Sequence, residues 1–185
     1  MKHKKIMLFC IVIIVIIIAS FISVIKYKTT KQEDFIVMLG NDFADVKVNA
    51  SIDKTFVSNF MESDYLLKII NKDASKIVDN KVLKISQLVK KSNIAFISIG
   101  TNDIKNLIKV DESLKVISFD EEIINRKIEI LLFNVNEIVN QLKTINPSIN
   151  VYLLKLDYFL NYKSEKVESY VDLINQEYKK ITNII

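Results

Sequence analysis

Both glycines of this 185-residue chain follow an apolar run and precede amide or carboxylate side chains. One block is Gly40–Asp42, after the run 35–39, and the other is Gly100–Asp103, after the run 94–99. Runs of this length ended by turn residues are typical of buried strands. In open parallel sheets the ligand-binding crevice lies at the carboxyl ends of the strands, so both blocks are predicted to line it. Glycine at these points permits tight turns that bring the backbone close to another group.

The chemistry available at these strand ends is that of amides and carboxylates. The chain has one histidine, His3, and one cysteine, Cys10, both near the N-terminus. A His-dependent triad, a His-based metal site and an intrachain disulfide therefore cannot be built from this chain alone. Asp42, Asp45 and Asp103 could hold a hard cation, but carboxylates scattered over loops are usually solvated. We predict no metal and no cofactor.

Length and charge exclude further classes. The length suits one ordinary domain. The net charge is +4, and Lys2, Lys4 and Lys5 contribute three of these charges, which leaves +1 (4 − 3) for the rest of the chain. A nucleic-acid-binding surface needs a basic stripe that replaces phosphate counterions, so we expect no nucleic-acid partner.

Apolar runs of strand length alternate with stretches that have helical spacing. The predicted strands are residues 35–39, 65–70, 94–99 and 151–156. The predicted helices are residues 54–61, 76–91, 118–146 and 167–181. Strands separated by helices predict a three-layer α/β fold, with a mostly parallel sheet of about four strands covered on both faces.

The long third helix has the clearest pattern. Ser118 and Glu121 have the spacing of a capping box and are predicted to open it. Apolar residues then recur at steps of three or four from Ile124 to Leu142, which predicts one core-facing stripe. Asn146 and Pro147 are predicted to end the helix.

The strand and turn at residues 97–103 (Ile-Ser-Ile-Gly-Thr-Asn-Asp) resemble the third conserved block of the SGNH/GDSL hydrolases. These are flavodoxin-like esterases, lipases and carbohydrate deacylases. Residues 35–42 fall where that family has its first strand and Gly-Asp-Ser nucleophile block, and Asn71 falls where its second block begins. Residues 144–154 are similar to the helix end and fourth strand of Gram-positive secreted members. The resemblance covers residues 35–185.

The resemblance implies a mechanism. A serine after the first strand attacks an acyl carbonyl, and a histidine near the C-terminus, oriented by an aspartate three residues earlier, removes its proton. The serine amide, a glycine amide and the asparagine of the third block bind the oxyanion. Asn102 matches that asparagine, and Gly40 matches the glycine of the first block. The other residues expected to line the crevice are Asn41, Asn71, Gly100, Thr101 and Asp103.

The chain departs from the family at the reacting groups. Asp42 stands where the family has its serine, and an ionised carboxylate is a poor acyl nucleophile that opposes a developing oxyanion. Asp73 and Lys76 stand at the glycine positions of the second block. The sequence reaches Ile185 before a fifth strand and an Asp-x-x-His block. We therefore expect a domain that is incomplete at its C-terminus and inactive or impaired as a hydrolase.

The N-terminal region predicts a membrane anchor. Residues 6–25 are 20 positions without a charge, and a helix of that length spans the roughly 30 Å hydrocarbon core. A cleaved signal peptide is the alternative, although no clear A-x-A site follows the run. We expect a basic tail at 1–5, a signal anchor at 6–25, a linker at 26–34 and the α/β domain at 35–185. The N-terminus is expected in the cytoplasm and the domain outside it.

Two functions fit these features. The first is a membrane-anchored extracytoplasmic SGNH-like protein with an impaired centre that retains an acylated or glycan ligand. The second is a non-enzymatic, membrane-tethered scaffold for a partner in the cell envelope, and an active esterase is the least favoured reading. If 151–156 is the last strand, its open edge favours a protein partner or self-association there.

Overall fold

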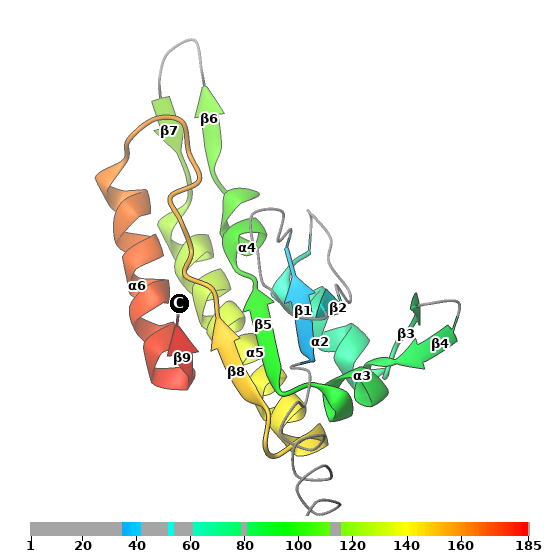
Figure 1. Ribbon diagram of the computed structural model, residues 1–185. Coiled ribbons are helices and arrows are strands. Elements are labelled where there is room, and N and C mark those ends of the chain that lie inside the picture. The colour runs from blue at the N-terminus through cyan, green and yellow to red at the C-terminus, as the bar shows by residue number, and fades with distance from the viewer. Residues whose placement is uncertain (1–34, 42–51, 54–60, 79–80, 112–115, 185) are drawn as a thin grey trace, which may run out of the picture. The chain divides into compact units, whose positions relative to one another are not determined.

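Five parallel strands form the central sheet of the computed structural model, in the order β2-β1-β5-β8-β9 (Figure 1). Their bounds are β1 Ile36–Gly40, β2 Ile52–Asp53, β5 Ile94–Ser98, β8 Asn150–Leu153 and β9 Asn183–Ile184. Every neighbouring pair is parallel. The prediction of an α/β fold with a mostly parallel sheet is confirmed.

The structure describes residues 35–41, 52–53, 61–78, 81–111 and 116–184. All of these belong to one unit of the chain, Asp34–Ile185. The predicted tail, membrane anchor and linker, most of the predicted helix 54–61, and Asp42 lie outside the described residues. No helix among the described residues is long and apolar enough to cross a membrane.

Four helices pack together on one face of this sheet. They are α2 (Ser63–Asn71), α3 (Ile85–Lys91), α5 (Glu121–Ile145) and α6 (Glu165–Ile181), and the other three contact α5. Side chains alternate along a strand, so Ala95 and Ile97 of β5 join the helices in the core. The intervening Phe96 lies on the opposite face, where its ring centroid is 5.6 Å from that of Tyr152.

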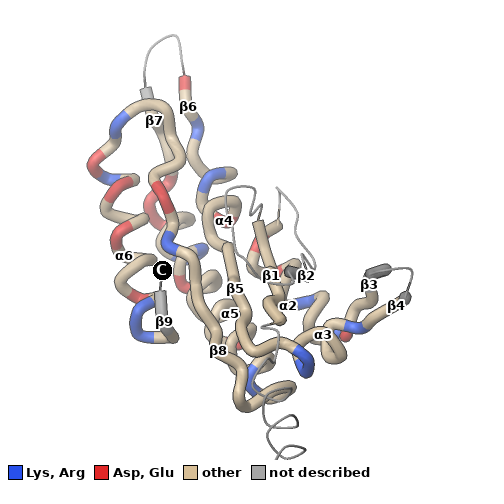
Figure 2. The backbone as a smooth tube through the Cα atoms, in the orientation of Figure 1, with Lys and Arg blue, Asp and Glu red and all other residues tan. Residues whose placement is uncertain are grey.

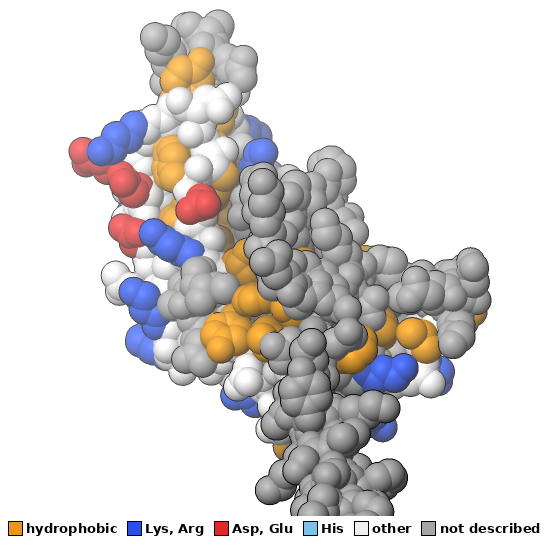
Figure 3. All heavy atoms as spheres, in the orientation of Figure 1, with side chains coloured by type: hydrophobic (Ala, Val, Ile, Leu, Met, Phe, Trp, Pro, Cys, Tyr) orange, Lys and Arg blue, Asp and Glu red, His pale blue; other side chains and the backbone are white. Residues whose placement is uncertain are grey.

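The second face of the sheet is less covered by described residues. Phe96 and Tyr152 are half-buried, and the space-filling view shows apolar side chains at the surface over β5 and β8 (Figure 3). No described helix lies on this face, so the expectation of cover on both faces stays a prediction. The strands β1, β5 and β8 carry no charge, whereas Lys and Glu residues recur along α6 (Figure 2).

Two antiparallel hairpins extend from the sheet. One pairs β3 (Ser75–Val78) with β4 (Lys81–Lys84), and the other pairs β6 (Lys109–Asp111) with β7 (Val116–Ser118). The second hairpin lies beyond the carboxyl end of β5, after the short helix α4 (Thr101–Lys105) (Figure 1). It therefore stands at the same end of the sheet as the two glycine blocks.

Several predicted elements are confirmed. The predicted strand 94–99 contains β5, the predicted strand 35–39 covers β1 except for Gly40, and α6 spans the predicted final helix. The stripe from Ile124 to Leu142 is buried along α5, and the helix ends just before Asn146.

Three predictions of local structure are wrong. Residues 65–70 belong to helix α2 because Leu66, Ile69 and Ile70 bury one helical face. Residues 76–91 divide into part of the β3–β4 hairpin and α3, since apolar residues four apart fit a hairpin as well as a helix. The cap of α5 is Asp120 and not Ser118, because the Asp120 carboxylate accepts the amides of Glu122 and Ile123.

The edge of β8 is also not open as expected. Tyr152 and Leu153 pair with Asn183 and Ile184 of β9, so the strand predicted as the last one has a neighbour. The hydroxyl of Thr182 donates to the carbonyl of Val151 at 2.9 Å and fixes the start of this pairing. An open edge of β8 was the reason to expect a protein partner or self-association there, and this edge is paired at Tyr152 and Leu153. The partner itself stays a prediction.

Candidate functional site

Gly40 is the last residue of β1, and Gly100 follows the end of β5 by two residues. Both have a backbone conformation that residues with a side chain rarely adopt. Their φ angles are +112° and +111°. A Cβ on Gly40 would lie 1.9 Å from the carbonyl oxygen of Ser98, so only glycine fits beside β5. The amide of Asn41 donates to the same oxygen at 2.6 Å. The two blocks predicted from the sequence are therefore brought side by side at the carboxyl end of the sheet.

Asn102 contacts Asn41 where the two glycine blocks lie side by side, and we call this place the Asn41–Asn102 junction. The Nδ2 of Asn102 donates to the Oδ1 of Asn41 at 3.1 Å and, at the long limit of 3.5 Å, to the carbonyl oxygen of Met61. Asn102 lies in α4, whose N-terminal residue, Thr101, is half-buried. The side-chain amide of Asn102 is thus aimed at the first block.

Asp103 is buried below this junction and holds helix α2. It is 1% exposed. Its carboxylate accepts the Ser63 hydroxyl at 2.6 Å and the Ser63 amide at 3.1 Å. Because Ser63 is the first residue of α2, Asp103 satisfies an amide that the helix itself cannot. The segment that contacts the second glycine block is therefore 61–63.

Asn71 is not part of this junction. It is exposed at the C-terminus of α2. Asn71 is eight positions after Ser63, which corresponds to about 12 Å along a helix axis. Of the site residues predicted from the sequence, Gly40, Asn41, Gly100, Thr101, Asn102 and Asp103 gather at one end of the sheet.

A charged cluster surrounds Asp103. Lys127 of α5 lies 3.2 Å from Glu62, 3.5 Å from Asp64 and 3.7 Å from Asp103. Asn134, two helical turns further along α5, donates to the Ser63 hydroxyl at 3.1 Å and also to Asp64. The cluster therefore ties α4, α5 and the start of α2 to one another.

Burial decides the electrostatics of this cluster. Removal from water raises the pKa of Asp103, while the Ser63 hydrogen bonds and the charge of Lys127 act against the rise. For Lys127, burial lowers the pKa, but the hydrogen bond to Glu62 and the charges of Asp103 and Asp64 outweigh it and raise the pKa. Lys127 therefore stays charged at neutral pH and compensates the buried carboxylate.

Tyr178 of α6 supports the Gly100 turn from the helix side. It is fully buried, and its hydroxyl donates to the carbonyl oxygen of Ile99 at 3.0 Å. Burial, together with the charge of Asp103, raises the pKa of Tyr178 well above its ordinary value, so the phenol stays a neutral donor. A Cβ on Gly100 would lie 2.8 Å from this hydroxyl oxygen. Glycine is therefore required for the turn that precedes Asn102.

The arrangement offers hydrogen-bond donors at the strand ends. Among the residues that the structure describes, no group of His, Cys, Asp and Glu side chains could hold a metal ion. Asp42 follows Asn41 directly in the sequence but lies outside the described residues, so its side chain is not placed.

Sequence reasoning missed four residues that position the site: Ser63, Lys127, Asn134 and Tyr178. Lys127 and Asn134 are seven residues apart, so they lie on one side of α5 beside its apolar stripe. Two polar side chains beside an apolar stripe are the sequence signal that could have identified these residues. Ser63 and Tyr178 lie far from the glycine blocks in sequence and gave no such signal.

Comparison with known proteins identifies the fold. No protein-family model and no curated protein matches the chain. Among solved structures, the lipase Lip_vut3 from a goat rumen metagenome matches with a TM-score of 0.59 at 16% identity, over 82% of this chain and 79% of that one. A Streptococcus pneumonia protein, provisionally identified as a platelet activating factor, matches with a TM-score of 0.51 at 14% identity, over 83% of this chain and 64% of that one. The domain therefore has a lipase-like α/β fold.

Proposed function

We propose that residues 35–185 form an SGNH/GDSL-type domain that binds an acyl ester or acylated glycan at the junction of Asn41 and Asn102. We further propose that it does not hydrolyse this ligand at the rate of an active esterase. Residues 6–25 would anchor the domain in a membrane and place it on the extracytoplasmic side.

The contact between Asn102 and Asn41 is the observation that carries this proposal. It joins the two strand ends at which this type of hydrolase binds an oxyanion, and buried Asp103 fixes the backbone next to Asn102. The 3.5 Å contact of Asn102 with the Met61 carbonyl is longer than its 3.1 Å bond to Asn41 and is therefore weaker. A ligand oxygen could replace it at small cost.

The identity of residue 42 argues against efficient hydrolysis. A carboxylate there provides no hydroxyl for attack, and its charge would repel the negative oxygen of a tetrahedral intermediate. Hydrogen-bond donors that stabilise an oxyanion also bind a polarised carbonyl. The domain would therefore still bind its ligand after hydrolysis is lost.

A serine-reactive fluorophosphonate probe tests the proposal. We expect no labelling of the unmodified chain and no turnover of short-chain p-nitrophenyl esters. Asp42→Ser restores a hydroxyl at the sequence position of the family's serine, and we expect slow labelling at residue 42 because residues 35–185 contain no histidine to act as its base. Asn102→Ala in that background should slow it by about 10²–10³. Asp45→Ser, which adds a hydroxyl three residues away, is the matched control and should stay unlabelled.

Two results would contradict this assignment. Robust labelling of the unmodified chain at a single serine would show that another nucleophile works there. Equal labelling rates for Asp42→Ser and for the double variant Asp42→Ser, Asn102→Ala would show that Asn102 is not an oxyanion donor.

The membrane anchor needs a separate experiment. We expect the chain to remain with membranes after carbonate extraction, and its domain to be cleaved by protease added outside intact cells. Replacing Ile14 and Ile17 together with lysine should release it from membranes, because charges at the bilayer centre are costly. Protection from external protease would contradict the proposed orientation.

A further inference from the structure

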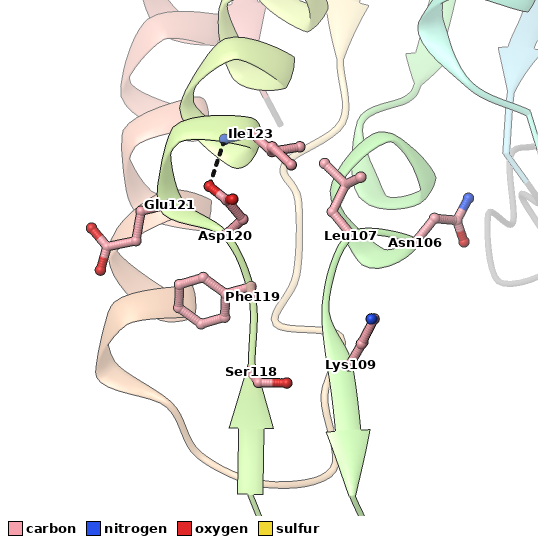
Figure 4. Close-up of a pocket in the computed structure, with 8 residues that line it drawn as sticks. All are labelled: Asn106, Leu107, Lys109, Ser118, Phe119, Asp120, Glu121 and Ile123. Atoms are coloured by element: carbon pink, nitrogen blue, oxygen red, sulfur yellow. Dashed lines mark hydrogen bonds between the residues drawn. The ribbon is translucent and has the colours of Figure 1, made fainter.

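A pocket of about 670 Å³ lies between the base of the β6–β7 hairpin, the end of α4 and the first turn of α5 (Figure 4). This volume is in the range of small-molecule sites. Leu107 and Ile123 point toward each other across the pocket, and Phe119 lies on the β7 side (Figure 4). These side chains form the apolar part of the lining.

The polar part of the lining is a cross-strand pair. Lys109 of β6 and Ser118 of β7 are register partners in the hairpin. Directly opposed residues have Cβ atoms roughly 4.5–5.5 Å apart, so both side chains reach one space. The Ser118 hydroxyl points toward β6 (Figure 4). Within the described part of the chain, the Lys109 ammonium has no ion pair and the Ser118 hydroxyl has no hydrogen bond.

The carboxylates of the lining are already engaged. Asp120 accepts the amides of Glu122 at 3.0 Å and Ile123 at 3.2 Å, so it caps α5. Glu121 pairs with Lys166 of α6 at 3.0 Å. Lys109 is consequently the charge of the lining that lacks a partner among the described residues.

We propose that this pocket binds an aliphatic carboxylate, with the anionic head at Lys109 and Ser118 and the chain along Leu107, Phe119 and Ile123. The ammonium and the hydroxyl both donate to a carboxylate, and the apolar side chains remove the methylene groups from water. This inference names a ligand class for a second site. It holds whether or not the Asn41–Asn102 junction takes up an acyl group.

The test is photo-crosslinking of the full chain in nanodiscs with three diazirine-bearing ten-carbon probes: a carboxylate, an alcohol and a trimethylammonium. Peptide mapping then locates the label. We expect the carboxylate to label residues 107–123 about fivefold more than either other probe, since one exposed ion pair contributes about 1 kcal/mol at most. Ile123→Asn should lower labelling by all probes in this region.

Lys109→Gln should reduce carboxylate labelling to the level of the alcohol. Lys105→Gln, which removes an exposed charge of α4 outside the lining, is the matched control and should change nothing. Asn102→Ala should also leave this labelling unchanged, which separates the pocket from the Asn41–Asn102 junction. Equal labelling by the three probes, preference for the cationic probe, or label confined to residues outside 107–123 would overturn the proposal.

Discussion

Removing the hydroxyl of Ser63 tests whether the buried Asp103 cluster holds helix α2 in place. Ser63→Ala deletes the 2.6 Å hydrogen bond to Asp103 and the 3.1 Å bond that the Ser63 hydroxyl accepts from Asn134, and it leaves the 3.1 Å bond from the Ser63 amide. A hydrogen bond to a charged group contributes about 1.5–3 kcal/mol, against about 1 kcal/mol for a neutral pair. Both residues are buried, so no water replaces the lost donor. We expect the free energy of unfolding to fall by about 2–3 kcal/mol at pH 7.

The pH dependence of this loss follows from the pKa of Asp103. Burial raises that pKa in the folded chain, so the unfolded chain releases the proton first as pH rises. The contribution of Asp103 to the free energy of unfolding therefore falls from about pH 4 up to its folded pKa and is level above it. The Ser63 hydroxyl lowers this pKa, so its removal raises the pKa further. The substitution should therefore cost less below the folded pKa of Asp103, where the carboxyl is protonated and the bond is neutral, than above it.

Urea unfolding followed by far-UV circular dichroism between pH 4 and pH 8 measures both effects. Ser86→Ala is the matched control, because the Ser86 hydroxyl also donates to a carboxylate, that of half-exposed Asp73, at 3.0 Å. There we expect a loss below about 1 kcal/mol. A Ser63→Ala loss that is equal at pH 4 and pH 8 would refute the role of the buried charge. If Ser63→Ala lowers the free energy of unfolding at pH 7 no more than Ser86→Ala does, the bonds between Ser63 and Asp103 do not hold α2 in place.

Two further substitutions test the turn before Asn102. Gly100→Ala puts a side chain on a residue with a positive φ and places its Cβ 2.8 Å from the Tyr178 hydroxyl oxygen. Urea unfolding should therefore show that the free energy of unfolding falls by at least about 1–3 kcal/mol. The side-chain amide of Asn102 should also shift in NMR spectra. Tyr178→Phe leaves the buried carbonyl of Ile99 without this donor and should cost about 1–3 kcal/mol by the same measurement, whereas unchanged stability would show that the carbonyl finds another partner.

The elements that could be predicted are those with one consistent pattern. Residues 94–99 are an uncharged apolar run that ends at a glycine, and α5 repeats its apolar positions over its whole length. The α2 segment was missed because its apolar residues are nearly continuous, so length and apolarity suggested a strand while Leu66, Ile69 and Ile70 formed a helical face. Short apolar runs do not distinguish these two periods.

The glycine blocks were predictable for a different reason. A chain with two glycines places both where a positive φ is needed, so their positions alone located the strand ends that meet. The partners of those strand ends were not predictable. Ser63 is 40 residues from Asp103 in sequence, and a contact at that separation depends on how α2 packs against α5. No local pattern specifies it.

The adjacent residues Asn102 and Asp103, both expected at the crevice, have different surroundings in the structure. Successive residues of a helix point about 100° apart, so one side chain can face Asn41 while the next faces the core. Asn102 is half-buried at the junction, whereas Asp103 is buried and satisfies the amide of Ser63. The aspartate thus contributes to stability by fixing α2, with no contribution from a ligand required. In this chain the aspartate of the Asn-Asp pair therefore has a structural role, and only the asparagine carries the expectation of binding.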